Sequence, residues 1–383
     1  MSDAQIQRFR EQILAAASSK SLLSIEGGGS KAWYGNPNAH PKLITKDYQG
    51  IVDYQPEELV ITARAGTPLS VIEAALAEKN QMLAFEPPHF GQHATFGGAI
   101  SAGLAGPRRI SSGNLRDFVL GTRLMDGQGQ DLSFGGKVMK NVAGYDVSRL
   151  LPGSLGTFAL LLEASVKVLP KPAATTSLRC CVSESRALKV LNEWAGQPLP
   201  LSASCWIGPA KADHDGELTI RLAGAVAAVQ SATLLMKSTL GASELDPVIA
   251  NTFWRDLREQ RLDCFTEPEG NQVLYRLALP ASCPAIAFSE WSDVSPSQPL
   301  VLEWHGQQRW WCGPSDARTQ SAIKQKAINH GGHATCFRVG SNGVQQRFTL
   351  LGDQAHSAAL TAVQNQLRSA FDPSGVFATG RLP

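Results

Sequence analysis

The chain has 383 residues, of which 43% are hydrophobic and 18% are charged, and its formal net charge is +2. The length predicts two or three domains, and the composition is that of a globular protein with a sizeable core. The near balance of charge disfavours a dedicated nucleic-acid binder, and no apolar run reaches the roughly 20 residues of a transmembrane segment.

The N-terminus and the cysteines indicate the compartment. The opening residues are polar and of mixed charge, so they lack the apolar core of a signal peptide. The seven cysteines are odd in number, and no pair has the C-x-x-C spacing of metal or iron–sulfur sites. We therefore expect a cytoplasmic protein with reduced thiols and no metal site.

The first elements alternate between helix and strand. Apolar residues at helical spacing predict an amphipathic helix over residues 4–17. After a short apolar run comes the glycine loop Gly27–Lys31, and residues 59–63 predict a strand. Thr67 is the expected N-cap of a following helix, with Pro68 as its first residue. The expected end of that helix is Asn80, and a further strand is expected at residues 82–85.

Glycine becomes frequent between residues 87 and 157. Asp126–Gly129 separates two short apolar runs, which predicts a β-hairpin formed by strands 118–125 and 130–134. A buried strand is expected over residues 158–169, and Pro170 and Pro172 mark a boundary after it. The later chain is less patterned, and its last predicted helix covers residues 354–371.

The first glycine loop matches a dinucleotide-binding pattern only by its letters. Gly27–Ala32 reads G-x-G-x-x-A, but that motif needs a helix that begins directly after the loop and holds the pyrophosphate at its N-terminus. Gly35, Pro37 and Pro41 are incompatible with such a helix. A nicotinamide-binding Rossmann fold is therefore disfavoured.

Three glycine loops, at residues 27–31, 95–109 and 153–157, suggest a shared ligand. Backbone N–H groups of such loops form a nest for an anion, and glycine allows close approach to a phosphate. Glycines come too often in residues 95–109 for a stable helix, and their neighbours are too small and apolar for a solvated linker. One such loop is as well explained by a tight turn, but three in order favour a ring-bearing, phosphorylated cofactor.

A series of short motifs carries a family resemblance. The motifs are Gly27–Lys31, Leu59–Gly66, Glu86–His89, Ala94–Gly98, Gly103–Arg109, Arg116–Gly121, Met139–Asp146, Gly331–Thr335 and Asp372–Phe377. In this order they resemble the vanillyl-alcohol oxidase, or PCMH-type, flavoprotein family, and within it the E subunits of glycolate oxidases. The resemblance is dense over residues 20–172 and thin over 173–325, and it returns at the C-terminus.

This resemblance implies an α+β fold with a PCMH-type FAD-binding domain over residues 1–172. That domain would consist of two α/β subdomains, a small parallel sheet followed by a mostly antiparallel one, with FAD extended between them. A smaller α/β cap or interaction domain would cover residues 173–328. Residues 329–383 would return to the FAD domain.

The resemblance also implies the residues that hold FAD. N–H groups of Gly27, Gly28, Gly29, Ser30 and Lys31 would bind the pyrophosphate. The other predicted cofactor residues are Pro88, Thr95, Gly97, Gly98, Ser101, Gly106, Gly153, Gly156 and Thr157. In relatives with covalent flavin a histidine of the first loop bonds the ring; Ser30 stands here, so we expect non-covalent FAD. Relatives end in Asn-Pro-Gly-Arg where this chain has Ala378–Arg381, so no cofactor contact is predicted for residues 378–383.

Candidate catalytic residues are few. Oxidation of a 2-hydroxy acid by a flavin needs a group for the hydroxyl proton, a cation for the carboxylate and the ring as hydride acceptor. His333, near His330, is the candidate for the first role, and Arg109, beside Arg108, for the second. A hydrogen-bonded loop histidine and an arginine facing solvent or a partner remain open alternatives.

The implied function is that of an FAD-binding subunit in a glycolate oxidase complex, which oxidises glycolate to glyoxylate. The chain would have a supporting or electron-transfer role beside a catalytic flavin subunit and an iron–sulfur subunit, which could place it at the inner membrane peripherally. Two alternatives stay open. One is a stand-alone FAD-dependent dehydrogenase or oxidase of a small 2-hydroxy acid, and the other is a structural subunit that no longer binds flavin.

Overall fold

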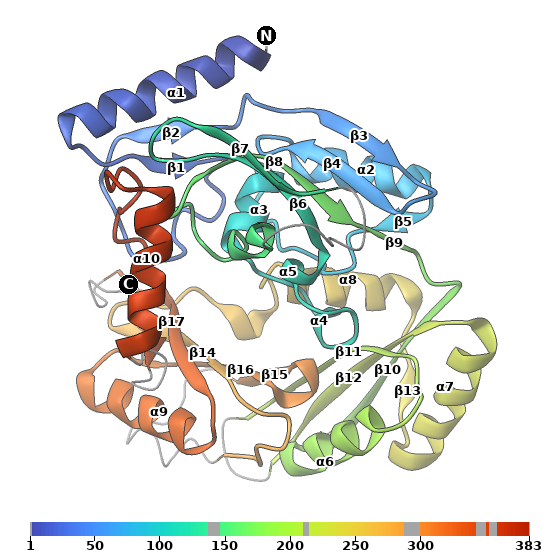
Figure 1. The fold of residues 1–383 in the computed structure, drawn as a ribbon. Coiled ribbons are helices and arrows are strands. Elements are labelled where there is room, and N and C mark those ends of the chain that lie inside the picture. Colours follow the sequence, from blue (N-terminus) through green and yellow to red (C-terminus); the bar gives the residue numbers. More distant parts are fainter. Residues whose placement is uncertain are drawn as a thin grey trace. The chain divides into compact units, whose positions relative to one another are not determined.

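The computed structural model describes residues 2–136, 146–209, 214–286, 299–341, 350–351 and 358–382 (Figure 1). The chain forms two compact units. Unit 1 contains Met1–Ala105, Asn114–Lys171 and His356–Pro383, and unit 2 contains Gly106–Gly113 and Pro172–Ala355. Residues 139–145 of the Met139–Asp146 motif lie outside the described residues.

Unit 1 contains a small parallel sheet and a larger antiparallel one, as the resemblance implied. In the parallel pair β1 (Ser24–Glu26) lies beside β2 (Lys42–Ile44). The five-stranded sheet has the order β3-β4-β8-β6-β7, and all its pairs are antiparallel. Its strands are β3 (Ile51–Gln55), β4 (Val60–Arg64), β6 (Val119–Met125), β7 (Asp131–Gly135) and β8 (Leu160–Lys167). A further pair joins β5 (Gln81–Met82) to β9 (Leu169–Pro170).

Helices cover both faces of this five-stranded sheet. On one face α2 (Leu69–Glu78) and α3 (Phe96–Ala102) bury apolar side chains in a core shared with β4 and β8. On the other face α1 (Ser2–Ser19) packs Ile6, Phe9 and Ile13 against a second core. Leu161 of β8 belongs to the first core, and its neighbours Leu160 and Leu162 belong to the second, because successive side chains of a strand point to opposite faces. Unit 1 also contains α5 (Leu115–Phe118), η1 (Val147–Leu150) and α10 (Ala358–Phe371).

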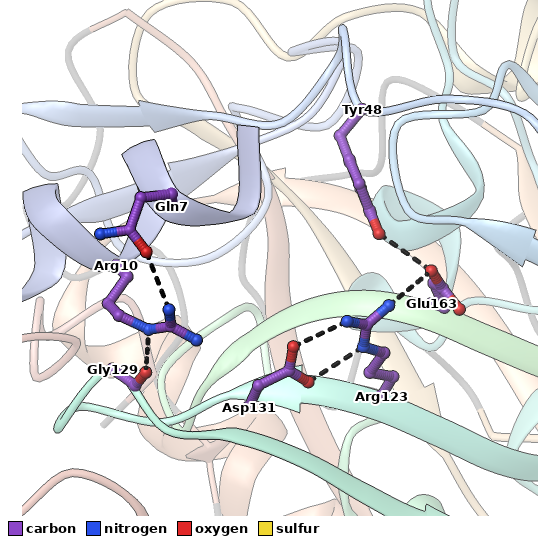
Figure 2. Close-up of polar contacts among 7 residues, drawn as sticks. All are labelled: Gln7, Arg10, Tyr48, Arg123, Gly129, Asp131 and Glu163. Atoms are coloured by element: carbon purple, nitrogen blue, oxygen red, sulfur yellow. Dashed lines mark hydrogen bonds and ion pairs between the residues drawn. The ribbon is translucent and has the colours of Figure 1, made fainter. Parts of the chain in front are cut away.

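A polar network crosses the α1-facing side of this sheet (Figure 2). Arg123 donates to both carboxylate oxygens of Asp131, at 2.9 and 2.8 Å, and to Oε1 of Glu163 at 3.1 Å. The hydroxyl of Tyr48 donates to the same Glu163 oxygen at 2.9 Å. Arg10 of α1 donates to the carbonyl oxygen of Gly129 at 2.9 Å, which fastens the helix to the β6–β7 turn.

Unit 2 is built on a nine-stranded antiparallel sheet with the order β13-β10-β12-β11-β15-β16-β14-β17-β18. Its strands are β10 (Ala174–Ser183), β11 (Leu201–Gly208), β12 (Asp215–Gly224), β13 (Ser243–Glu244), β14 (Gln272–Ala278), β15 (Leu300–Glu303), β16 (Gln308–Pro314), β17 (His333–Val339) and β18 (Leu350–Leu351). The strands of this sheet run from Ala174 to Leu351, beyond residue 328, where the sequence analysis expects the cap domain to end.

One apolar core joins this sheet to three helices. They are α6 (Glu184–Ala195), α7 (Val226–Leu240) and α9 (Ala317–Asn329). A fourth helix, α8 (Pro247–Arg258), is anchored through Trp254, which donates to the hydroxyl of Ser177 at 2.9 Å. Shorter elements of unit 2 are α4 (Arg109–Ser112), η2 (Asp263–Phe265) and η4 (Trp304–Gly306).

The chain changes units at places that differ from the predicted organisation. Gly106–Gly113 belongs to unit 2, although it lies within the range predicted as one flavin domain. The return to unit 1 comes at His356 rather than at residue 329, because β17 pairs with β14 inside the sheet of unit 2.

Three local predictions also need correction. Residues 96–102 form α3 despite their glycines. Pro68 is the N-cap of α2 without a side-chain cap, and Thr67 instead accepts a hydrogen bond from the Gly50 N–H at 2.9 Å. The strand expected over residues 82–85 is limited to Gln81–Met82.

Two further findings concern the chain as a whole. All seven cysteines lie in the described part of the chain, and none forms a disulfide there. No helix within the described ranges is long and apolar enough to cross a membrane.

Candidate functional site

A cavity in unit 1 brings together segments from distant parts of the sequence. Its lining residues are Ile25–Ala32, Thr45, Ala65, Thr95, Gly97, Gly98, Ser101, Ala102, Leu155, Gly156, Ala159, Leu161 and Arg381. Residues 25–32 cover the end of β1 and the loop after it. Residues 95–102 belong to α3 and its N-cap, and residues 155–161 lie just before and within β8. Parts of all three predicted glycine loops therefore line one cavity.

The first loop turns sharply without starting a helix. Gly29 has a φ of +74°, and the Ala32 N–H donates to the Gly29 carbonyl oxygen at 3.0 Å. A second turn follows, in which the Tyr34 N–H donates to the Lys31 carbonyl oxygen at 3.0 Å. No helix begins directly after the loop, as expected from the prolines and the glycine that follow it, and the glycine backbone of the loop lines the cavity.

The first and second loops touch through their glycines. A Cβ on Gly28 would overlap the carbonyl oxygen of His93, and one on Gly27 would overlap the hydroxyl of Thr95. Glycine is required at both positions because backbone or a buried side chain occupies the space of a side chain. This close approach forms one wall of the cavity.

The second loop is organised by α3. Thr95 caps the helix by accepting a hydrogen bond from the Gly98 N–H at 3.2 Å. Gly97 lies so close to Ala65, which follows β4, that a Cβ would clash. At the other end, Gly103 has a φ of +64° and acts as a left-handed C-cap. The Leu155 N–H donates to the Ser101 carbonyl oxygen at 2.8 Å, which fixes the third loop to the helix.

The structure separates the predicted cofactor residues into two groups. Those that line the cavity are Gly27, Gly28, Gly29, Ser30, Lys31, Thr95, Gly97, Gly98, Ser101 and Gly156. Those that do not are Pro88, Gly106, Gly153 and Thr157. Gly153 lies against Gly103, Thr157 is buried and donates to the Ser154 carbonyl oxygen, and Gly106 belongs to unit 2.

Two cationic side chains line the cavity. Lys31 is 8% exposed, donates to the His89 carbonyl oxygen at 3.1 Å and lies 5.8 Å from the centre of the Phe90 ring. Arg381 donates to the carbonyl oxygens of Tyr34, at 3.1 Å, and Lys31, at 2.8 Å. Desolvation lowers the pKa of Arg381 below its ordinary value, and the nearby charge of Glu26 opposes this effect.

Arg381 is one of the cavity residues that sequence reasoning missed, and the one that brings positive charge. The chain lacks the asparagine and proline of the family pattern at residues 378 and 379, and for that reason no cofactor contact is predicted for residues 378–383. The usable indication was the Gly380–Arg381 pair, which keeps the last two letters of that pattern.

The candidate catalytic residues lie outside this cavity, in unit 2. The guanidinium of Arg109 lies 4.3 Å from the ring centre of Trp304. His333 is an exposed residue at the start of β17, and His330 is the C-cap of α9. The lining residues of the cavity all belong to unit 1, whereas both predicted catalytic residues belong to unit 2.

The cavity suits a phosphorylated nucleotide. Its wall is rich in glycine backbone, and its lining contains two cationic residues, Lys31 and Arg381, beside one acidic residue, Glu26, so it resembles an anion-binding nest. Small and apolar residues such as Ala65, Ala159 and Leu161 supply a surface for a ring. None of the described lining residues is a histidine, cysteine or tyrosine that could form a covalent bond to a flavin.

Comparison with known proteins identifies the domain that contains this cavity. Residues 6–135 match the family model described as an FAD binding domain. Two solved structures of alkyldihydroxyacetonephosphate synthase share the fold, with TM-scores of 0.66 and 0.67 at 14% identity, covering 97% of this chain and 74% and 73% of theirs. The fold is therefore that of an FAD-binding flavoprotein of the PCMH type.

A curated relative defines the family more narrowly. The chain is 44% identical to the glycolate oxidase subunit GlcE of Escherichia coli (strain K12), over 98% of this chain and 97% of that protein. It is 34% identical to the glycolate oxidase subunit GlcD of Bacillus subtilis (strain 168), over 36% of this chain and 29% of that protein. The chain belongs to the family of the glycolate oxidase subunit GlcE.

Proposed function

We propose that this chain is the FAD-binding subunit of a glycolate oxidase complex that oxidises glycolate to glyoxylate. The observation that carries the proposal is the single cavity lined by three separated glycine segments and two cations. The relationship to GlcE over nearly the whole chain supports the assignment to glycolate oxidase.

Each part of the cavity has a proposed task toward FAD. Backbone N–H groups of Gly27–Lys31 bind the pyrophosphate, with the charge of Lys31 beside them. The segment from Thr95 to Ala102 lies along the pyrophosphate and the ring. When bound, FAD supplies the hydride acceptor that no amino-acid side chain provides. The cofactor is held without a covalent bond because Ser30 occupies the loop and no lining side chain replaces a histidine.

The chain has a supporting or electron-transfer role rather than the primary substrate chemistry. No imidazole lines the cavity within the described residues. Electrons accepted by the flavin must leave, and the sequence contains no C-x-x-C pair to hold an iron–sulfur cluster. A catalytic flavin subunit and an iron–sulfur subunit are the partners proposed here.

The test begins with the isolated chain. We expect the purified chain to show the visible bands of oxidised flavin, and acid precipitation to release all of that colour into the supernatant. A colourless chain that fails to take up added FAD would contradict the proposal and favour a structural subunit. Colour retained in the acid pellet would overturn the non-covalent assignment alone.

Partners are tested by co-expression. We expect the chain to co-purify with a catalytic flavin subunit and an iron–sulfur subunit, and glycolate oxidation to require that complex. Bleaching of the isolated chain by glycolate would instead identify a stand-alone dehydrogenase. Failure of any stable complex to form would exclude the subunit role.

A further inference from the structure

Arg381 is the second cation of the cavity and lies near the end of the chain. Its side chain contacts the first glycine loop, which lies near the other end of the sequence. Nε donates to the Tyr34 carbonyl oxygen and a terminal nitrogen donates to the Lys31 carbonyl oxygen. These two carbonyls belong to the turn that closes the loop directly after Gly27–Lys31.

Backbone contacts reinforce this connection. The Asn36 N–H donates to the Arg381 carbonyl oxygen at 3.0 Å, and the Asn36 side-chain amide donates to the Gly380 carbonyl oxygen at 3.0 Å. Gly35 has a φ of +91°, and a Cβ there would meet the Arg381 carbonyl oxygen at 2.9 Å. Residues 31–36 and 380–381 are therefore packed backbone to backbone.

The charge of Arg381 is not neutralised by a salt bridge in the described part of the chain, although Glu26 of the cavity lining is near enough to act on its pKa. Within the described residues the guanidinium forms no ion pair, and it donates hydrogen bonds to two carbonyl oxygens. Glu26, the acidic residue nearby, is paired with Lys42 at 2.7 Å. Two of five N–H donors of the guanidinium are thus used by protein carbonyls, and a desolvated positive charge faces a cavity that suits an anion.

We propose that Arg381 is a positioning residue for the pyrophosphate-binding loop. It holds the carbonyls of Lys31 and Tyr34 so that the N–H groups of Gly27–Lys31 face the cavity, and its charge offsets that of the bound pyrophosphate. This inference rests on the proposed FAD function. It assigns a cofactor role to a residue of the segment 378–383, for which the sequence analysis predicts no cofactor contact.

The test compares Arg381→Gln and Arg381→Lys with Arg8→Gln. Arg8 is an exposed residue of α1, so the last variant makes the same charge change in the same unit away from the cavity. FAD affinity of the flavin-free full chain is measured by fluorescence titration, with ADP as a competitor that carries the pyrophosphate without the ring. We expect Arg381→Gln to weaken both FAD and ADP by roughly tenfold or more, and Arg8→Gln to leave both unchanged.

Hydrogen exchange without FAD separates positioning from charge alone. Lysine keeps the charge but cannot donate from the forked geometry of a guanidinium. We therefore expect faster exchange across residues 29–36 in both Arg381 variants, and an intermediate loss of FAD affinity in Arg381→Lys. Unchanged exchange in these residues, or wild-type affinity in Arg381→Gln, would overturn the inference. If the wild-type chain itself bound neither FAD nor ADP, the proposed function would fail instead.

Discussion

Gly28 shows how one missing side chain shapes the site. A Cβ at this position would overlap the carbonyl oxygen of His93, and a backbone oxygen cannot move aside as the end of a flexible side chain can. The loop must therefore shift if any other residue stands there. Such a shift would move the N–H groups that the cavity presents to an anion.

We expect Gly28→Ala to weaken FAD binding by at least roughly tenfold and to lower the free energy of unfolding by about 1–3 kcal/mol, as overpacking does. Gly196→Ala is the control, since Gly196 has a φ of −84° and its Cβ would come no closer than 3.7 Å to a neighbour. Fluorescence titration and urea unfolding measure the two effects. Wild-type affinity in Gly28→Ala would show that the contact with His93 does not fix the loop.

Tyr48 carries a second prediction at this scale, because its environment favours the protonated phenol. Desolvation, the hydrogen bond to Glu163 and the negative charge of Glu163 raise the pKa of Tyr48 from 10.0 to about 12 (Figure 2). Below pH 10 the phenol is protonated in both the folded and the unfolded chain. Between pH 10 and 12 it ionises in the unfolded chain first, so folding loses stability as the pH rises.

Tyr48→Phe should therefore change the pH dependence of stability. At pH 7 it removes one hydrogen bond and costs about 1 kcal/mol. The wild-type chain loses up to about 1.4 kcal/mol per pH unit above pH 10 through this residue, and the variant does not. The difference in unfolding free energy between the two should shrink from pH 9 to pH 11 in urea titrations. A constant difference would mean that the pKa of Tyr48 is not raised.

At the scale of elements, α3 separates what the sequence could predict from what it could not. The β6–β7 hairpin was predicted because Asp-Gly turns and alternating apolar residues are local features. Residues 96–102 were predicted as a non-helical loop because glycine disfavours a helix. Tertiary packing reverses this preference: Phe96, Ala99 and Ile100 are buried, and Gly97 allows α3 to approach Ala65. The glycines serve close packing, which a local pattern does not reveal.

Because α3 has a weak intrinsic helix preference, its N-cap should matter. Thr95→Ala removes the acceptor for the Gly98 N–H and should lower the free energy of unfolding by about 1 kcal/mol. Thr95→Ser keeps the hydroxyl and should cost less than half as much. Urea unfolding of both variants, without FAD, gives the comparison. Equal losses in the two variants would point to the methyl group of Thr95 rather than to its capping bond.

At the scale of the whole molecule, local sequence patterns do not show to which unit or sheet a segment belongs. The sequence predicts one shared region for three glycine loops, because each loop carries its own composition; parts of all three line one cavity, whereas Gly106 and Gly153 do not. It did not place Gly106–Gly113 in unit 2 or β17 in the nine-stranded sheet. Those assignments depend on pairing between segments far apart in the chain, and a single sequence gives no register for such pairs.

Closure of unit 1 depends on the last residues of the chain. Val376 and Phe377 are fully buried in the core beneath α1, and the Leu23 N–H donates to the Val376 carbonyl oxygen at 2.8 Å. Asp372 accepts hydrogen bonds from the Val376 and Phe377 N–H groups, at 2.8 and 2.7 Å. The C-terminal segment is thus a structural part of the unit that contains the cavity.

Two truncations separate this structural contribution from the cofactor contribution. Ending the chain after Phe371 removes two buried side chains, each contributing about 1.5–3 kcal/mol, so unit 1 should lose at least about 3 kcal/mol of stability. Ending it after Thr379 keeps that core but removes Gly380 and Arg381, so it should weaken FAD binding with a much smaller change in the unfolding midpoint. Thermal unfolding and FAD titration of both chains give the two readouts. Equal midpoints for the two truncated chains would mean that the core beneath α1 is stable without its C-terminal residues.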